Sequence, residues 1–416
     1  MSMDEMLKES VELHKVVEDL LLQNAYLQTT GDAFTLNRGG VAIPYIVSQP
    51  GAGKTASFAS ICKLINWSLV TVHLAMKPLE ELGGIPNFKD VEINGKKYPG
   101  TIWTIPDLIG QLYQLANEPD TNGVFLCFDD IHLCGSMYLG LMQEFFTERT
   151  IRGYKIPDNT AIVLFGNSTN KAGAKTTSSA ITNRCCMLPV LTSFDNWRRK
   201  FALGTNTDVP KLKFDPNRLR DVADKIDRVH PAIVSFLEND AYQNFFHEEE
   251  QVEKAWGSPR SWTRFSNWLM AYELVTGQIM DSYYCTYLGA GHVGKEGAAE
   301  FAKYYNIYSK FNIAEIFDNV DRYQLPSAPV DKYALAFAMS SYYCNHEQRK
   351  TLTDPFCKMV IKYIDEYKDM ALIIVRDILD TEKLTKKKSI YMDFSMAINQ
   401  MRPGITHELL EEVNNV

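Results

Sequence analysis

The residues best suited to chemistry lie near the start of the chain, where residues 48–55 read Ser-Gln-Pro-Gly-Ala-Gly-Lys-Thr after the apolar run 45–47. This arrangement matches a phosphate-binding loop between a strand and a helix. Glycines leave room for backbone N–H groups around phosphate oxygens, while a lysine reaches the outer phosphates and a threonine holds Mg²⁺. The sequence therefore predicts a site for a nucleoside triphosphate with Mg²⁺, formed by Gly51, Ala52, Gly53, Lys54 and Thr55.

This loop departs from the usual pattern at its first position, where the chain has Ser48 in place of glycine. Serine is small, and the residues that would surround the phosphates are intact. They open a predicted helix whose N-terminal dipole favours anions. A chance glycine-rich turn is the alternative interpretation of this segment alone.

Two adjacent acids follow the apolar run 124–128, as Asp129 and Asp130. An apolar strand that ends in carboxylates is typical of a second nucleotide motif, in which one acid orders Mg²⁺ and the other polarises the attacking water. We expect Asp129 to take the first role and Asp130 the second. Taken alone, such a pair also fits a solvated strand end, so the interpretation depends on the phosphate loop upstream.

Three further side chains are candidates for the same chemistry. Asn167 follows the apolar run 161–165, and its amide can contact the γ-phosphate and orient water at once. Arg184 and Arg260 can stabilise the charge that spreads over a transferred phosphoryl group. The alternatives are a turn-forming asparagine and surface arginines in ordinary ion pairs.

Taken in order along the chain, these segments resemble the AAA+ ATPases, and more closely their MoxR branch. The matching stretches lie between residues 41 and 273 and are SQPGAGKT, PLEELGGIP, GVFLCFDDIH, LMQEFFTERTIRGYKIPDN, FGNSTN, ITNR and GSPRSW. The resemblance implies hydrolysis of ATP with Mg²⁺ in a ring of subunits, a hexamer by analogy. It implies Walker A roles for Lys54 and Thr55, Walker B roles for Asp129 and Asp130, sensor 1 for Asn167, a trans-acting arginine finger for Arg184, and sensor 2 for Arg260.

One departure from the family pattern concerns the rate of hydrolysis. Asp130 stands where the family usually has glutamate. Its shorter side chain holds the carboxylate about one methylene further from the water, and a misplacement of that order can greatly slow a reaction. We therefore expect ATP to be bound well and hydrolysed slowly.

The elements that must position these residues are predicted from hydrophobic periodicity. Short apolar runs alternate with helical patterns between residues 41 and 192, which predicts an α/β core around a parallel sheet with strands at 45–47, 69–74, 124–128 and 162–165. The resemblance implies that this is the AAA+ nucleotide-binding core. We expect an amphipathic helix within residues 1–40, a helical lid over 193–275, and a mainly helical C-terminal region over 276–416, including a helix that starts at Asp354 and Pro355.

Two short segments predict hairpins inserted beside this core. The first spans residues 91–98 around Asn94 and Gly95, and the second spans residues 150–157, with Tyr154 as an exposed aromatic candidate. Both are candidates for contacts with a substrate or a central pore, and ordinary surface hairpins are the alternative. The glycines of residues 289–294 match a dinucleotide-binding pattern, but no strand and acid follow, so we expect a turn between helices.

Composition limits the function classes that remain. The chain has 416 residues, 51 acidic against 43 basic, and a formal net charge of -8, which argues against sequence-independent nucleic-acid binding. Its eight cysteines show neither metal-ligand nor disulfide spacing, as in a reducing compartment. No signal peptide or membrane-spanning stretch is recognisable. These features predict a cytoplasmic protein without a membrane partner.

Three functions are consistent with this sequence. The first is a ring-shaped ATPase that remodels a protein, with a partner carrying a von Willebrand A domain implied by the family resemblance. The second is a nucleic-acid motor or loader on the same core, with a basic pore of Lys96, Lys97, Arg152 and Lys155. The third is a nucleotide-gated scaffold with slow turnover, suggested by Asp130.

Overall fold

The computed structural model describes residues 11–12, 20–29, 40–167, 179–191, 198, 215, 218–219, 221, 225–226, 228–239, 241–247, 255–346, 348–385 and 389–415. Contacts divide the chain into two compact units. The first comprises residues 1–228 and 247–298, and the second comprises residues 229–246 and 299–416. The predicted division at residues 40, 192 and 275 stays a prediction, because compactness alone does not define a functional domain.

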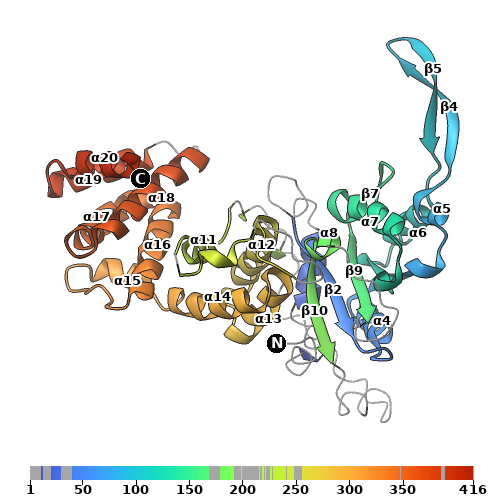
Figure 1. Ribbon diagram of the computed structural model, residues 1–416, viewed down its shortest axis with the longest axis horizontal. Helices are drawn as coiled ribbons and strands as arrows, with labels where there is room; N and C mark the ends of the chain where they lie inside the picture. Colours follow the sequence, from blue (N-terminus) through green and yellow to red (C-terminus); the bar gives the residue numbers. More distant parts are fainter. Residues whose placement is uncertain are drawn as a thin grey trace. The chain divides into compact units, whose positions relative to one another are not determined.

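A parallel β-sheet forms the centre of the first unit (Figure 1). Among the described residues its strand order is β1-β10-β2-β9-β6-β3, and every neighbouring pair is parallel. The strands are β1 (Val11–Glu12), β2 (Ile43–Ser48), β3 (Trp67–His73), β6 (Gly123–Asp129), β9 (Thr160–Asn167) and β10 (Cys185–Leu191). The four predicted strands are confirmed, each with different ends, and β10 is an additional strand that the apolar pattern did not indicate.

Helices accompany this sheet throughout the first unit. They are α3 (Leu22–Gln28), α4 (Lys54–Ile65), α5 (Leu79–Gly83), α6 (Asp107–Ala116), α7 (Ser136–Glu148), α8 (Ser179–Thr182), α12 (Pro259–Thr276) and α13 (Ser282–Val293), with the 3-10 turns η4 (Leu74–Met76) and η5 (Ile131–Leu133). The side chains of β6 and β9 are almost all buried, which explains why these strands read as continuous apolar runs. Because the strands are parallel, their carboxyl ends meet at one edge of the sheet.

Both predicted hairpins are present in the first unit. The longer one pairs β4 (Pro86–Ile93) with β5 (Lys96–Trp103) around Asn94 and Gly95, which both have positive φ angles. It projects as a two-stranded ribbon from the α/β body of this unit (Figure 1). The shorter one pairs β7 (Thr150–Ile151) with β8 (Tyr154–Lys155). Tyr154 is only partly exposed and donates a hydrogen bond to the Trp103 carbonyl at 2.6 Å, so its expected exposure is wrong.

The glycine pattern of residues 289–294 belongs to a helix and not to a turn between helices. Gly289 and Gly291 lie inside α13, and only Gly294 follows it with a positive φ angle of 88°. A Cβ atom at Gly291 would lie 2.5 Å from the Met187 carbonyl oxygen. Small residues are therefore needed here because α13 packs directly on β10, and the pattern carries no sign of a dinucleotide site.

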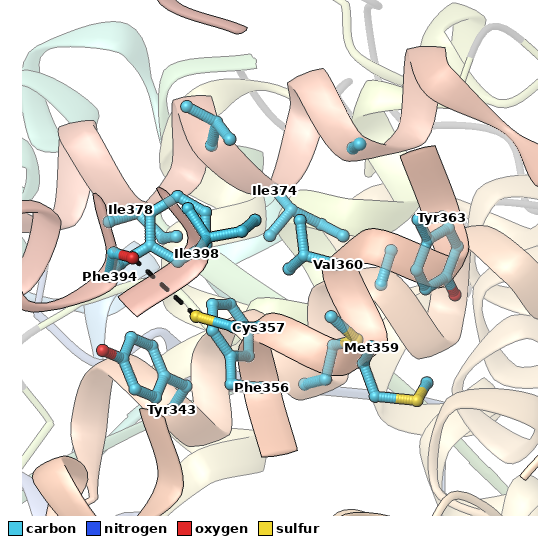
Figure 2. Close-up of a cluster of buried hydrophobic side chains, with 14 of the residues drawn as sticks. Tyr343, Phe356, Cys357, Met359, Val360, Tyr363, Ile374, Ile378, Phe394 and Ile398 are labelled. Carbon is cyan, nitrogen blue, oxygen red and sulfur yellow. Dashed lines mark hydrogen bonds between the residues drawn. The ribbon is translucent and has the colours of Figure 1, made fainter. Parts of the chain in front are cut away.

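The second unit is helical in its described residues. It contains α11 (Pro231–Glu238), η7 (Gln243–Phe245), most of α14 (Lys295–Tyr308), α15 (Ile313–Asp318), α16 (Pro329–Asn345), α17 (Arg349–Glu366), α18 (Lys368–Thr385), α19 (Ile390–Met401) and α20 (Ile405–Asn415). Figure 2 shows part of its core, in which the rings of Phe356 and Tyr343 stack at 4.1 Å. The α/β core and this helical region confirm the predicted fold class.

Two expectations about helix positions need correction. Helix α17 begins at Arg349, and Pro355 lies inside it, so Asp354 and Pro355 do not start the helix. The helical spacing predicts one core face of Phe356, Met359, Val360, Tyr363 and Tyr367; the first four are buried, but Tyr367 is 36% exposed and follows the end of α17, so its assignment to the core is wrong. In the N-terminal segment, residues 11–12 pair with β10 and the helix α3 begins at Leu22, while the remainder of the predicted helix falls outside the described residues. None of the helices described is long and apolar enough to span a bilayer.

Candidate nucleotide-binding site

The predicted phosphate loop connects the carboxyl end of β2 to the first residue of α4. Gly51 and Gly53 have φ angles of 77° and 73°, in the left-handed region that glycine adopts without strain. A Cβ atom at Gly51 would meet no atom within 4 Å, so the space in front of the loop is open there. The 12-residue helix α4 begins at Lys54, and the backbone N–H groups of its first turn can donate hydrogen bonds to phosphate oxygens.

The ammonium group of Lys54 is held by side chains from two neighbouring strands. Its Nζ lies 2.9 Å from Ser48 Oγ and 2.9 Å from Asn167 Oδ1. Lys54 is only 8% exposed, and this burial lowers its pKa below the usual value, while Asp129 and Asp130 act in the opposite direction. Ser48, the residue that breaks the glycine pattern, thus contacts the lysine that defines the motif.

The acidic pair lies beside the loop, at the end of β6. Thr55 Oγ1 is 3.3 Å from Asp129 Oδ2, which brings together the two oxygen ligands predicted for Mg²⁺. Asp129 Oδ1 also accepts a hydrogen bond from the backbone N–H of Asp130 at 2.9 Å. Asp130 has a φ angle of 56°, a left-handed conformation that aspartate tolerates better than most residues.

Asn167 connects the lysine to the acidic pair. Its Nδ2 lies 3.4 Å from Asp130 Oδ1, while its Oδ1 accepts from Lys54. Its backbone N–H donates to His132 Nδ1 at 3.4 Å. Burial lowers the pKa of His132 below its usual value, which favours the neutral imidazole that can accept this bond. Sequence reasoning assigned no role to His132, although it lies two residues after Asp130.

The two predicted arginines lie elsewhere. Arg184 directly precedes β10, and the register pairs Cys185 with Ile43 at the amino end of β2. The Arg184 carbonyl accepts from the backbone N–H of Ile43 at 3.3 Å. Arg184 lies one residue before this pair, and five further residue steps lead along β2 from Ile43 to Ser48, so the separation is roughly 20 Å at the usual rise per residue. Arg184 therefore lies at the edge of the sheet opposite the phosphate loop.

Arg260 belongs to the same edge as Arg184. It occupies the first turn of α12 and is exposed, two residues after Ser258, which contacts the neighbour of Arg184. Burial is the main reason why the pKa of Arg184 is lowered, and the charge of Arg260 is the next. The candidate site residues thus form two groups, one around Lys54 and one around Arg184.

The first group fits a magnesium nucleotide. Thr55 and Asp129 offer hard oxygen ligands, and Mg²⁺ in such sites is completed by water and substrate phosphates. The part of the chain that the structure describes contains no separate cluster of three His, Cys, Asp or Glu residues that could hold a metal. The metal would be held by these two residues together with the phosphates and water.

Comparisons with known proteins give a coarse likeness only. No family model matches this chain, and no curated protein matches it. Among solved structures, a candidate ATPase from Cytophaga hutchinsonii is 12% identical, with 77% of this chain and 92% of that chain covered at a TM-score of 0.42. A full-length MCM homologue from Methanopyrus kandleri is also 12% identical, with 73% and 62% covered at a TM-score of 0.31.

Proposed function

We propose that this protein is a MoxR-like AAA+ ATPase that hydrolyses ATP with Mg²⁺ in a ring of subunits and remodels a protein partner. The observation that carries the proposal is the convergence of Lys54, Thr55, Asp129, Asp130 and Asn167 at the carboxyl edge of the parallel sheet. Ligands of open α/β sheets bind at that edge. A chance glycine-rich turn would not bring these five side chains together.

Each residue of this group has a distinct task in the proposed reaction. Lys54 neutralises the outer phosphates, and Thr55 with Asp129 holds Mg²⁺, which withdraws charge from the phosphate oxygens. Asp130 holds the attacking water in line with the phosphorus atom and accepts a proton from that water. Asn167 already bridges Lys54 and Asp130, so it can hold the γ-phosphate and the water in one orientation.

The position of the arginines supports the proposed assembly into a ring. Arg184 lies roughly 20 Å along β2 from the phosphate loop, which is far longer than an arginine side chain. Within one subunit it cannot contact a triphosphate bound at Lys54. Arg184 acts instead on the nucleotide of the neighbouring subunit. Arg260 lies on the same edge of the sheet and acts on that same nucleotide. A ring, for which a hexamer is the form implied by the family, closes such head-to-tail contacts.

The long hairpin supports a protein as the substrate. Phe88 and Ile93 on β4 are 84% and 55% exposed, and Tyr98 on β5 is 48% exposed. A two-stranded ribbon is marginally stable alone, and exposed apolar residues on it mark a contact surface. We propose that this hairpin binds the protein partner, for which a von Willebrand A domain is the candidate implied by the family.

The proposal is tested with purified protein, ATP and Mg²⁺. We expect the parent chain to bind and hydrolyse ATP, Lys54→Ala to lose binding, and Asp130→Asn to keep binding but to hydrolyse at least ~100-fold more slowly. Phosphate release measures turnover, and a fluorescent ATP analogue measures binding. A parent chain with no affinity for ATP and Mg²⁺ would refute the proposal, and salt-sensitive stimulation by DNA would favour the nucleic-acid motor instead.

A further inference from the structure

Two segments that each carry a candidate arginine are joined by a compact polar network. Asn183 precedes Arg184, and its Oδ1 accepts hydrogen bonds from Ser258 Oγ at 2.6 Å and from Ser261 Oγ at 3.1 Å. Ser258 also caps α12, because its Oγ accepts from the Ser261 backbone N–H at 3.1 Å. One side chain thus ties the turn before β10 to the first turn of the helix that bears Arg260.

A second connection reinforces the first. Arg264, one turn further along α12, donates from Nη1 to the Arg184 carbonyl oxygen at 2.6 Å. Arg264 is almost fully buried, and so are Ser258 and Ser261. Buried hydrogen bonds are costly to break, because their polar groups would be left unsatisfied away from water. The relative position of the two segments is therefore well defined.

This network opposes an electrostatic repulsion. Arg184, Arg260 and Arg264 lie within electrostatic range of one another, and their like charges contribute to lower pKa values for Arg184 and Arg264, after the larger effect of burial. Like charges separate unless other interactions hold them. The neutral bonds of Asn183 and the two serines do so without cancelling the positive charge that an anion requires.

We infer that Asn183, Ser258 and Ser261 are positioning residues that hold Arg260 in register with Arg184, so that both guanidinium groups reach the same phosphate oxygens of a neighbouring subunit. This inference rests on the proposed function and deepens it. Neither the serines nor the asparagine touches the nucleotide. Their effect on hydrolysis passes through the two arginines, and a misplacement of about 1 Å at such groups can slow a reaction ~100-fold.

The test compares Asn183→Ala with Asn159→Ala. Asn159 is a matched control, because it is also partly buried and donates one side-chain bond, to the Ala116 carbonyl. We expect Asn183→Ala to lower kcat at least ~10-fold with KM and the affinity for the fluorescent ATP analogue unchanged, since Lys54 is untouched. Asn159→Ala should leave kcat, KM and the affinity for the analogue unchanged. Equal behaviour of the two variants in an active parent would overturn the inference.

A double-variant comparison separates positioning from general destabilisation. If Asn183 acts through Arg260, Asn183→Ala should change kcat by less than about twofold in an Arg260→Ala background, because non-additive effects mark residues that act as a unit. Full additivity would contradict the inference. The conservative variant Ser258→Thr keeps the hydroxyl group and should retain activity, whereas Ser258→Ala should reproduce the loss of kcat.

One measurement does not depend on hydrolysis. The backbone N–H of Ser261 is protected by Ser258, which in turn bonds to Asn183. We expect amide hydrogen exchange at Ser261 to accelerate in Asn183→Ala and to stay unchanged in Asn159→Ala. Unchanged exchange in Asn183→Ala would overturn the inference even if the parent chain proved inactive, an outcome that would refute the proposed function separately.

Discussion

At the scale of single residues, the least expected contact is the one between Ser48 and Lys54. The usual phosphate loop begins with glycine, and a serine there weakens a pattern match. In this chain the hydroxyl group accepts a hydrogen bond from the lysine ammonium at 2.9 Å. Lys54 therefore has acceptors on both sides, Ser48 on β2 and Asn167 on β9, which orient it before any phosphate is bound.

We predict that Ser48→Ala weakens ATP binding. Removing one hydrogen bond to a charged group forfeits about 1.5 kcal/mol, or a ~10-fold rise in the dissociation constant, since Lys54 then has to be ordered by the nucleotide. Binding of a fluorescent ATP analogue measures the change. Ser395→Ala removes a hydroxyl group on α19 that bonds only to the Met392 carbonyl, and it serves as the control. Unchanged affinity in Ser48→Ala would show that this bond has no role in binding.

A second residue-scale prediction concerns the shorter acid. Asp130 reaches less far than glutamate would, so Asp130→Glu should bring the carboxylate closer to the attacking water and raise kcat about 10-fold or more. Phosphate release under saturating ATP measures the effect. A large gain from a nearly inactive parent would favour the slow-turnover scaffold. A loss of rate would instead show that the left-handed backbone at Asp130 suits only the shorter side chain.

At the scale of elements, the close packing of α13 on β10 is a sensitive point. We predict that Gly291→Ala destabilises the fold by at least about 2 kcal/mol, because its Cβ would lie 2.5 Å from the Met187 carbonyl oxygen and 2.7 Å from Cys186 Sγ. Chemical denaturation measures the change in the free energy of unfolding. Gly140→Ala is the matched control: it lies in α7 with nothing within 4 Å, so the same change should stabilise by up to ~1 kcal/mol. Equal effects would refute the packing argument.

The same helix carries a pH dependence. His292 is buried against Phe265 and Trp268, and burial lowers its pKa to about 4. Between pH 6.5 and 4 the unfolded chain binds a proton at this site and the folded chain does not, so stability falls as the pH falls. The expected loss is about 3 kcal/mol, from 1.36 kcal/mol per unit of pKa difference.

Urea unfolding at several pH values between 6.5 and 4 checks whether the free energy of unfolding falls as the pH falls. His292→Leu should flatten the difference between pH 6.5 and 4 relative to the parent chain. The control is His407→Gln, on the exposed face of α20, where the side chain is 79% exposed and hydrated whether the chain is folded or not. A His292→Leu variant with the same pH dependence as the parent would contradict the prediction.

At the scale of the whole molecule, Lys54 and Arg184 lie at opposite edges of the sheet, and this placement predicts that the two residues meet only between subunits. Lys54 lies after the carboxyl end of β2, whereas Arg184 lies at the amino end of the neighbouring strand. Mixing Lys54→Ala chains with Arg184→Ala chains should therefore restore part of the ATPase activity, because each mixed interface can combine one intact loop with one intact arginine. Steady-state phosphate release measures the recovery, with each variant alone as the control. Absence of recovery despite normal co-assembly would exclude an arginine acting in trans.

The sequence by itself determined the chemistry of the loop and the elements that flank it. Gly51 to Thr55, the acids after an apolar run and the Asn94-Gly95 turn are local signals, because each depends on a few neighbouring residues. The helical character of the second unit was also readable from periodicity. Element ends were not, as α17 shows by continuing through Pro355, because tertiary packing outweighs local propensity.

Only the tertiary structure decided which of these residues meet. The Ser48 contact with Lys54, the His132 contact with Asn167 and the bonds of Asn183 to α12 join residues that are separated in the chain by up to 78 positions. Strand order then placed the arginines at one edge of the sheet and the phosphate loop at the other. Such relations depend on which strands pair and in which register, and pairing is a long-range choice that no local pattern encodes.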